Sequence, residues 1–395
     1  VMSYLFTSES VSSGHPDKLC DQISDAILDE CIKLDPNARV AVEAFVKGME
    51  DKSLIVLGGE VTVDGEVPDY EKIARDVCIN VGYNSHEIGM DARSSELCEM
   101  KVAITTQSPD ISDGVNIGGA GDQGMMFGYA SKETSEYMPA PIMYSHKLMS
   151  TLADIRKNNI ELMPYLRPDA KAQVTFEYND NHEIQKIDTI VISTQHDPVV
   201  ANLTDKDAIR AYIEEDLKKY LIPEVLPAEF LEGKIEYYVN PTSNFVIGGP
   251  HGDAGLTGRK IIVDTYGGRA PHGGGAFSGK DPTKVDRSGA YAARHLAKNI
   301  VAAGIADECT IQISYAIGVV EPVSIHVSTP NSSDQDRALE EFIRKNENMK
   351  LSPEGIIERL DLRRPIYRQT AAYGHFGKAG LPWEELNLVD EFKKF

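Results

Sequence analysis

The sequence lacks paired cysteines and is short of positive charge, which excludes several classes of protein. Its five cysteines are scattered along 395 residues, and no two form a C-x-x-C pair. An odd, dispersed set fits neither a disulfide framework nor a thiolate metal site. The 61 acidic residues outnumber the 40 Lys and Arg, giving a formal net charge of −21. Because nucleic acids and anionic membranes are bound by neutralising phosphates, a general role in binding either is excluded.

Long apolar runs are also missing. No stretch approaches the roughly 18 apolar residues of a membrane span. The N-terminus, from Met2 to Thr7, lacks the basic region and apolar stretch of a signal peptide. Hydrophobic residues make up 42% and charged residues 26%, as in soluble globular proteins. We therefore expect a reduced, soluble protein of cytoplasmic type, and the length predicts about two to four domains.

One order of predicted elements occurs three times along the chain. Apolar residues at helical spacing predict a first helix, two short strands follow, and a second helix closes each unit. The first helices begin roughly 130–140 residues apart, which favours an internal triplication over a chance recurrence. Short loops join the two strands of each unit, so the strands should be antiparallel and the fold class α+β. The predicted units are 17–34, 40–46, 54–58 and 70–81; 144–155, 173–178, 188–193 and 206–220; and 286–303, 310–317, 323–327 and 333–345.

Two glycine-rich segments come close to nucleotide-binding motifs without satisfying them. Residues 119–124 fit G-x-G-x-x-G, but a polar stretch precedes them and Asp122 would place a carboxylate beside the pyrophosphate. Residues 274–280 match a P-loop as far as Lys280, but Asp281 follows where a Ser or Thr is needed. Neither a Rossmann site nor a true P-loop is predicted. The second segment can still present backbone N–H groups and one cation to phosphate.

Charge around this second segment runs against the acidic chain. Between Gly255 and Arg287 only Asp264, Asp281 and Asp286 oppose six positive residues. A solvated surface loop is the alternative, but interleaved glycines favour close approach of the backbone to an anion. We therefore predict anion binding by a segment that contains Arg259, Lys260, Arg269, Lys280, Lys284 and Arg287.

The N-terminal segment carries the complementary groups. His15 and Asp17 flank Pro16 where a loop enters the first predicted helix. Asp17 is either an acid that stabilises the helix N-terminus or a ligand of magnesium, which proteins bind through one or two carboxylates plus substrate phosphates. His15 is either structural or part of the chemistry.

Taken together, these segments resemble the S-adenosylmethionine synthetase (methionine adenosyltransferase) family. Its two signatures are matched by residues 119–129 and 273–281, and residues 7–18 and 252–268 match as well. The blocks are collinear over nearly the whole chain, from about Leu5 to Gly380. Several long blocks in order are more specific than any single glycine motif.

The resemblance implies a fold of three similar α/β-hairpin domains in a pseudo-threefold arrangement. We place them at 1–103, 118–235 and 236–395, with elements interleaved and a mobile active-site loop at 104–117. Family members pair two subunits through sheet faces, with active sites between them. A homodimer, and a homotetramer built of two dimers, are therefore expected. This would explain why strand 40–46 alternates only loosely between apolar and polar residues.

The implied reaction joins ATP and L-methionine. Attack of the methionine sulfur on the ribose C5′ gives S-adenosylmethionine and tripolyphosphate, which water then cleaves to phosphate and diphosphate. Two Mg²⁺ ions per active site and one K⁺ per subunit are implied as cofactors.

The resemblance also carries roles to individual residues. The catalytic set is His15, Lys171, Arg259, Lys280 and Asp122. ATP and its polyphosphate would contact His15, Asp169, Lys171, Asn244, Phe245, Asp253, Arg259, Lys260, Ala276 and Lys280. Methionine would contact Glu60, Gln107, Asp253 and Lys284. The magnesium carboxylates would be Asp17 and Asp286, and the potassium-site acid Glu43.

Two other functions fit the sequence less well. A metal-dependent polyphosphate hydrolase would have no use for the methionine contacts Glu60 and Gln107. A catalytically silent nucleotide sensor would be expected to lose His15, Lys171 or the second signature, and all are intact.

Overall fold

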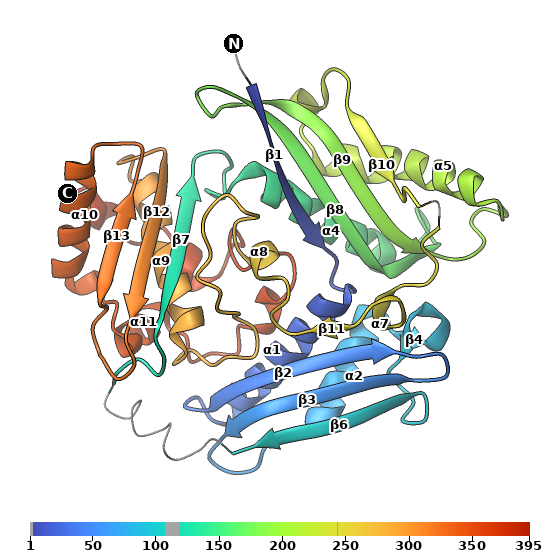
Figure 1. Cartoon of the computed structure of the whole chain (residues 1–395), viewed down its shortest axis with the longest axis horizontal. Coiled ribbons are helices and arrows are strands. Elements are labelled where there is room, and N and C mark those ends of the chain that lie inside the picture. The colour runs from blue at the N-terminus through green and yellow to red at the C-terminus, as the bar shows by residue number, and fades with distance from the viewer. Residues whose placement is uncertain (1–2, 107–117, 243) are drawn as a thin grey trace.

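The computed structural model describes residues 3–106, 118–242 and 244–395, which form three larger sheets backed by helices (Figure 1). The predicted threefold recurrence of helix, antiparallel hairpin and helix is confirmed. The first repeat is α1 (Pro16–Leu34), β2 (Arg39–Gly48), β3 (Ser53–Thr62) and α2 (Tyr70–Val81). The second is α4 (Ala140–Asn158), β8 (Leu166–Asn179), β9 (Ile184–His196) and α5 (Lys206–Asp216). The third is α9 (Val285–Ala302), β12 (Glu308–Tyr315), β13 (Ser324–Ser328) and α10 (Ser333–Lys345).

One predicted helix ends early. The pattern predicts a single helix over 206–220, but α5 stops at Asp216 and a π-helical turn, Leu217–Leu221, follows. The short helix α6 (Ile222–Val225) comes next and contains Pro223. Proline has no N–H to donate and its ring clashes with the carbonyl four residues earlier, so a regular helix cannot run through it.

Each of the three larger sheets gains a strand from the segment that precedes another repeat. β1 (Ser3–Val11) pairs with β8, β7 (Gly124–Ser131) with β12, and β11 (Gly255–Leu256) with β2, all antiparallel. The exchange is cyclic. β1, before the first repeat, joins the sheet of the second; β7, before the second, joins that of the third; and β11, before the third, joins that of the first. Two sheets gain a further, parallel strand, β6 (Cys98–Thr105) on β3 and β10 (Glu236–Val239) on β9. The domain boundaries 1–103, 118–235 and 236–395 stay a prediction. Each of the three exchanged strands pairs with a strand that lies in a different predicted domain.

The remaining elements are short. They are the strand pair β4 (Asn84–Ser85) and β5 (Met90–Asp91), and the helices α7 (Gly249–Gly252), α8 (Ile261–Asp264), α11 (Pro353–Leu360) and α12 (Val389–Phe392). Among the helices of the described ranges, none is long and apolar enough to cross a bilayer.

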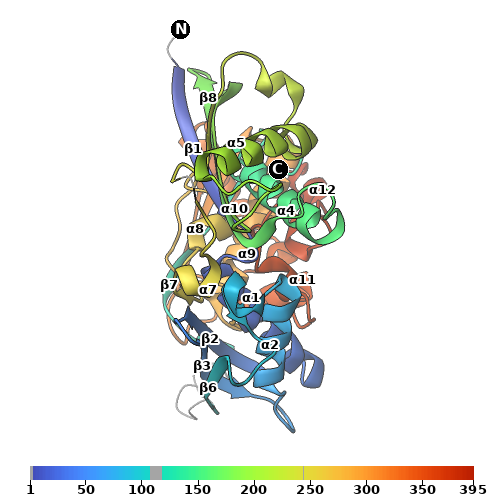
Figure 2. The ribbon, with the colours of Figure 1, turned by 90° about the vertical axis from the view of Figure 1, so that its right-hand side faces the viewer.

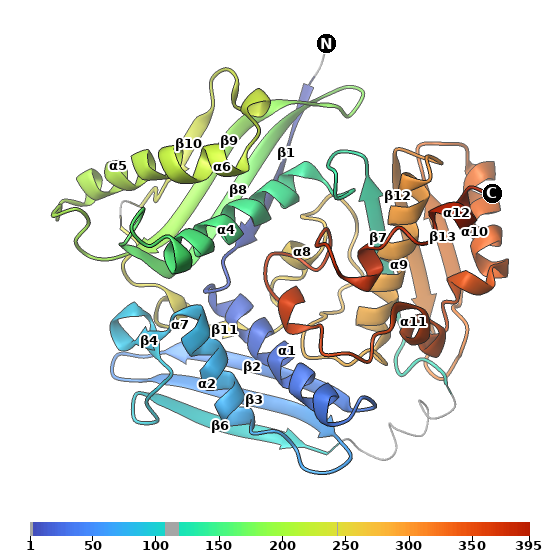
Figure 3. The ribbon, with the colours of Figure 1, turned by 180° about the vertical axis from the view of Figure 1, so that it is seen from behind.

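The strands lie on one side of the molecule and the helices on the other (Figures 2 and 3). α1 is buried from Pro16 to Asp29, and α9 is buried almost throughout. On the helix side, alternate strand residues such as Val40, Val42, Ile55 and Leu57 are fully buried. Their neighbours on the opposite face are only half-buried, which matches the loose alternation of the sequence.

Buried ion pairs tie the central helices together. Lys18 of α1 bonds to Asp21, at 2.7 Å, and to Asp264 of α8. Asp25 of α1 accepts two hydrogen bonds from Arg287 of α9, at 2.7 and 2.9 Å. A buried charge without a partner is costly, so these pairs hold α8 and α9 against α1.

His295 on α9 illustrates how burial makes the fold depend on pH. Its Nε2 donates to Asn387 and its Nδ1 accepts from Arg359, both at 2.7 Å, so the ring must be neutral. Burial and the Arg359 charge lower the pKa of His295 to about 3. In the unfolded chain the pKa is about 6.5, so the unfolded state takes up a proton first as the pH falls. The stabilisation is complete above about pH 6.5 and is lost toward pH 3.

We predict that His295→Gln loses less stability on acidification than the parent chain. Between pH 6.5 and 4.5 the histidine accounts for about 2–3 kcal/mol of the parent's loss. Urea unfolding at the two pH values gives the difference directly. Comparison with the variant is needed because burial raises the pKa of Asp21 to about 7 and of Asp29 to about 6, effects of opposite sign. His326→Gln, an exposed control, should behave like the parent; equal losses in parent and His295→Gln would contradict the prediction.

Candidate active site

The start of α1 brings together the first set of predicted site residues. His15 is the N-cap residue, and its Nδ1 accepts the N–H of Asp17 at 3.2 Å. Asp17 accepts Lys260 Nζ at 2.6 Å and the N–H of Leu256 at 3.0 Å. The exposed Arg259 lies 3.9 Å from the same carboxylate. Burial opposes ionisation of Asp17, but the hydrogen bonds from Lys260 and Leu256 lower its pKa overall.

His15 is neutral at physiological pH. Burial, followed by the nearby charge of Lys260, lowers its pKa to about 3. Because Nδ1 is an acceptor, the single proton of the ring lies on Nε2. His15 can therefore donate a hydrogen bond from Nε2 without carrying a charge.

Strand β8 adds a second set beside the first. Lys171 is exposed on the strand, close enough for its charge to lower the pKa values of His15 and Asp169. Asp169 is buried; its Oδ2 accepts the N–H of Gly249 at 2.9 Å and its Oδ1 has no partner in the described part of the chain. Burial raises the pKa of Asp169 to about 6, and the charge of exposed Asp253 contributes in the same direction.

Phe245 presents a partly open ring near this set. Its backbone exchanges hydrogen bonds with His196, through its N–H at 3.1 Å and its carbonyl at 3.0 Å. The ring is half-buried and pairs with no other described aromatic ring. Asn244, the preceding residue, is exposed. A planar base could stack on this ring.

A second group of predicted residues lines a cavity of about 500 Å³ on the outer face of β2 and β3. Glu43 and Glu60 enter it from the strands, and Ala276 and Lys280 from the second glycine-rich segment. Leu256, whose N–H bonds to Asp17, also lines this cavity, so the two groups are neighbours. Lys280 Nζ lies 2.7 Å from Asp286 at the start of α9.

Buried side chains of α1 and α9 hold the second glycine-rich segment in place. Arg287 donates to the carbonyls of Phe277, at 2.9 Å, and Lys280, at 3.2 Å, while Asp25 accepts the N–H of Gly279 at 2.8 Å. Gly279 has φ +82°, and any Cβ there would lie 2.0 Å from the carbonyl oxygen of Val42. Only glycine allows this segment to lie so close to β2.

All six cations predicted to bind an anion lie within 4 Å of a carboxylate, and three of them pair with carboxylates that are not predicted to bind magnesium. Arg287 is buried against Asp25, Lys284 pairs with Asp281, and Arg269 lies 3.5 Å from Glu308. The sequence count missed this because Asp25 and Glu308 are remote in the chain. The other three, Arg259, Lys260 and Lys280, lie on the predicted magnesium carboxylates Asp17 and Asp286. Anion binding by this segment would therefore depend on these three cations leaving their carboxylates.

One described residue of the predicted set, Asp122, shows no contact with the others. Asp122 is exposed on the loop before β7, and within the described ranges it accepts only the N–H of Gln123, at 2.8 Å. Gln107 and most of the predicted loop 104–117 lie outside the described residues.

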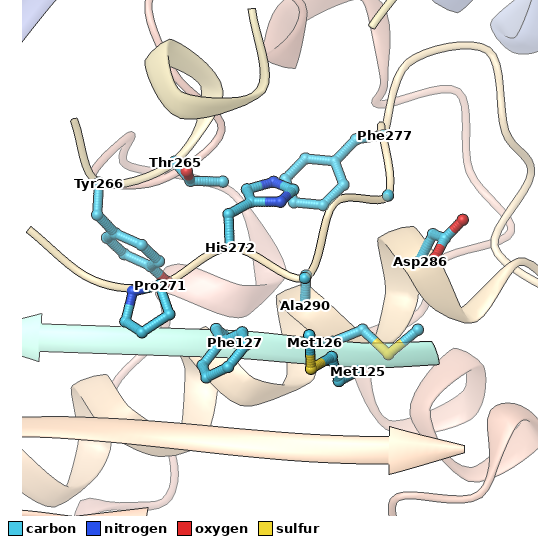
Figure 4. Close-up of a pocket in the computed structure, with 12 residues that line it drawn as sticks. Met125, Met126, Phe127, Thr265, Tyr266, Pro271, His272, Phe277, Asp286 and Ala290 are labelled. Carbon is cyan, nitrogen blue, oxygen red and sulfur yellow. The ribbon is translucent and has the colours of Figure 1, made fainter. Parts of the chain in front are cut away.

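A pocket of about 10 Å³ beside β7 has room for no more than a water molecule. There His272 lies against Phe277, with Asp286 at the rim (Figure 4).

The carboxylates fit a metal only if the substrate supplies further ligands. Among the described residues, no group of three or more His, Cys, Asp or Glu side chains could hold a metal ion. Asp17 and Asp286 each offer one carboxylate beside a lysine, which suits Mg²⁺ that arrives with phosphate oxygens. Glu43 has no hydrogen-bond or ion-pair partner in the described ranges, so its oxygens are open to a hard cation.

Sequence reasoning missed two residues that position the site. Asp25 anchors Gly279 and Arg287, and Gln195 anchors Asp169. Gln195 is fully buried; it accepts the Asp169 N–H at 3.3 Å and donates to Ile88, at 2.6 Å, and Val246, at 3.1 Å. Neither residue lies in a glycine-rich or charged motif, so no local signal marks it.

Comparison with known proteins covers the whole chain. Residues 3–109, 117–245 and 247–385 match the N-terminal, central and C-terminal domains of S-adenosylmethionine synthetase. The S-adenosylmethionine synthase of Clostridium tetani (strain Massachusetts / E88) is 53% identical over 409 residues, with 99% of each chain covered. That of Chlorobium phaeobacteroides (strain DSM 266 / SMG 266 / 2430) is 52% identical over 405 residues, with 99% of this chain and 98% of the relative covered. The chain belongs to the S-adenosylmethionine synthetase family.

Proposed function

We propose that the chain is a methionine adenosyltransferase, which makes S-adenosylmethionine, phosphate and diphosphate from ATP, L-methionine and water. The observation that carries the proposal is the cluster of His15, Asp17, Lys171 and Lys260 at the start of α1. Full-length identity of 53% to an S-adenosylmethionine synthase supports it.

The site residues would divide into sets that contact adenine, the polyphosphate and methionine. Phe245, with its open ring face, would stack on adenine, and Asn244 and Asp169 lie beside it along the nucleotide. Lys171, Arg259, Lys260, Lys280 and Ala276 would contact the polyphosphate. Glu60, Gln107 and Lys284 would contact methionine, and Asp253 both substrates. Asp122 would order the active-site wall.

The leaving group sets the chemical demand. The methionine sulfur is already nucleophilic when neutral, so no general base is required. Negative charge accumulates on the departing triphosphate, and fixed cations aimed at it stabilise the transition state. Lys171 and Arg259 suit this role because both are exposed and neither is hydrogen-bonded to a described side chain. Neutral His15 can donate from Nε2 to the departing oxygen.

Asp17 and Asp286 would each hold one Mg²⁺, and Glu43 would contribute to a K⁺ site. When bound, the Mg²⁺ ions would neutralise charge on the polyphosphate oxygens. In this structure Lys260 Nζ lies 2.6 Å from the Asp17 carboxylate, and Lys280 Nζ lies 2.7 Å from that of Asp286. Substrate binding would therefore move both lysines from carboxylate to phosphate.

We also propose a homodimer formed through the sheet faces, with a tetramer as two dimers. Leu54 and Val56 of β3 and Phe45 of β2 are half-buried on the face that no helix covers. A second copy seated there would bury them and enclose the cavity of Glu43 and Lys280. The mobile loop at 104–117 and a cytoplasmic location stay predictions.

Lys171→Met should lower kcat by at least about a hundredfold, the cost of losing one preorganised electrostatic group. The side chain has no hydrogen-bond or ion-pair partner among described residues, so its loss should leave the fold intact. Turnover is measured as sulfonium product formed from ATP and methionine. Lys206→Met, which removes an exposed lysine from α5, is the matched control. Turnover near that of the control would refute the assigned role.

Asp17→Asn should raise the Mg²⁺ concentration needed for half-maximal activity by at least about tenfold, because even outer-shell changes at metal sites cost that much. Asparagine keeps an oxygen to accept the Leu256 N–H but loses the charge. Initial rates over a magnesium titration measure the effect. Asp76→Asn removes a carboxylate from a surface pair with Lys72 and serves as the control. An unchanged magnesium midpoint would rule out Asp17 as a ligand.

Leu54→Lys should shift the solution mass from dimer or tetramer toward monomer, because it places a charge in the proposed interface. Light scattering after size-exclusion chromatography gives the mass. Leu34→Lys, an equally drastic change at an exposed position ending α1, should leave the mass unchanged. A monomeric parent chain, or an unaltered mass for Leu54→Lys, would argue against this interface.

A further inference from the structure

A second, larger cavity opens on the helix side of the molecule. Its volume is about 730 Å³, within the range of about 300–1,000 Å³ typical of small-molecule sites. The ends of α2 and α4, the inner part of α1 and the segment 365–378 form its wall. Figure 3 shows these helices converging on that segment, on the face opposite the strands. The cavity shares no lining residue with the one that contains Glu43 and Lys280.

Cations without counter-ions line this cavity. Lys157 of α4 has no hydrogen-bond or ion-pair partner in the described part of the chain. Among the residues that the structure describes, the Arg368 guanidinium donates only to Asn80 Oδ1, at 3.3 Å. Lys378 Nζ donates to two neutral carbonyls, those of Gln369, at 2.7 Å, and Ala372. No ion pair joins any of these three to a described carboxylate.

The two carboxylates in the wall are already occupied. Asp29 accepts the backbone N–H groups of Tyr367 and Arg368, both at 2.9 Å. Asp154 accepts the side-chain amides of Asn158, at 2.6 Å, and Asn159, at 3.2 Å. Their oxygens are therefore turned to structural donors rather than to the cations.

Burial and nearby positive charges disfavour the charged forms of both lysines. Burial, together with the charges of Arg156 and Arg368, lowers the pKa of Lys157. Burial and the charge of Lys18 lower the pKa of Lys378 to about 7. In a chain with a net charge of −21, most lysines and arginines find a carboxylate, so a cavity where several do not is an exception.

We propose that this cavity is a binding site for a small molecule that bears a phosphate or diphosphate group. Lys157 and Arg368 would hold the anionic group, since charge-assisted hydrogen bonds from a lysine and the planar fork of an arginine suit phosphate oxygens. Asn80 and Gln369 supply further polar contacts, and the volume leaves room for the rest of the ligand. The site does not depend on the proposed transferase activity.

The test uses inorganic diphosphate as the probe, titrated calorimetrically at constant ionic strength. Because the proposed active site would also take diphosphate, the parent for this test is Arg259→Gln/Lys280→Gln. We expect this parent to bind diphosphate, and Lys157→Gln/Arg368→Gln added to it to weaken binding at least about tenfold, the scale of losing charge-assisted hydrogen bonds. Lys206→Gln/Arg344→Gln removes two exposed, unpaired cations elsewhere and should leave the affinity unchanged.

Two results would overturn the site. One is a parent that binds no diphosphate; the other is equal affinity in the parent and the Lys157/Arg368 variant. If that variant does not fold, Lys157→Gln alone decides, because the Lys157 side chain makes no hydrogen bond or ion pair with a described residue. Its affinity should fall at least about threefold. Lack of S-adenosylmethionine synthesis would count against the proposed function but leave this binding test unaffected.

Discussion

The buried pair of Asp25 and Arg287 is the interaction on which the rest of the site depends. Both side chains are fully buried, and removing one would leave the other as an unpaired charge, at a cost of about 3–5 kcal/mol. The pair also bonds to the backbone of the second glycine-rich segment, at Phe277, Gly279 and Lys280. The pair thus fixes α9 to α1 and sets the path of the loop that carries Lys280.

The three repeats depend on one another through exchanged strands. In the described ranges, each of the three larger sheets includes a strand from the segment that precedes another repeat. The exchange also builds the site: β11 places Leu256 next to Asp17, and β1 leads directly into His15. β8, which pairs with β1, carries Asp169 and Lys171. Residues from three regions of the sequence therefore meet only when the sheets of the first and second repeats are both assembled.

The sequence predicts what is local and misses what is remote. The helices Tyr70–Val81 and Ser333–Lys345 begin and end where predicted, since Asp69 and Ser332 cap them with side-chain hydrogen bonds that the sequence signals. The hairpins follow from short loops between strands. β1 pairs with β8, which lies in the second repeat. The side-chain pattern of a strand does not identify the strand that pairs with it. The same limit hid the neutralisation of Arg269 and Arg287 by Glu308 and Asp25. Roles for site residues came from family resemblance, because a lone histidine or aspartate carries no such information.

The ion pairs of Lys260 and Lys280 suggest how the site would balance charge when the substrate binds. Lys260 and Lys280 are held by Asp17 and Asp286, so without substrate the site leaves neither these lysines nor these acids unpaired. A magnesium-bound polyphosphate brings both signs at once: its oxygens can take the lysines and its metal ions the carboxylates. Each group then exchanges one partner for another, and no desolvated charge is left alone at any stage. An acidic chain can in this way bind a strongly anionic substrate without a permanent positive patch at the site. The helix-side cavity differs in this respect, because its cations have no carboxylate partners to exchange.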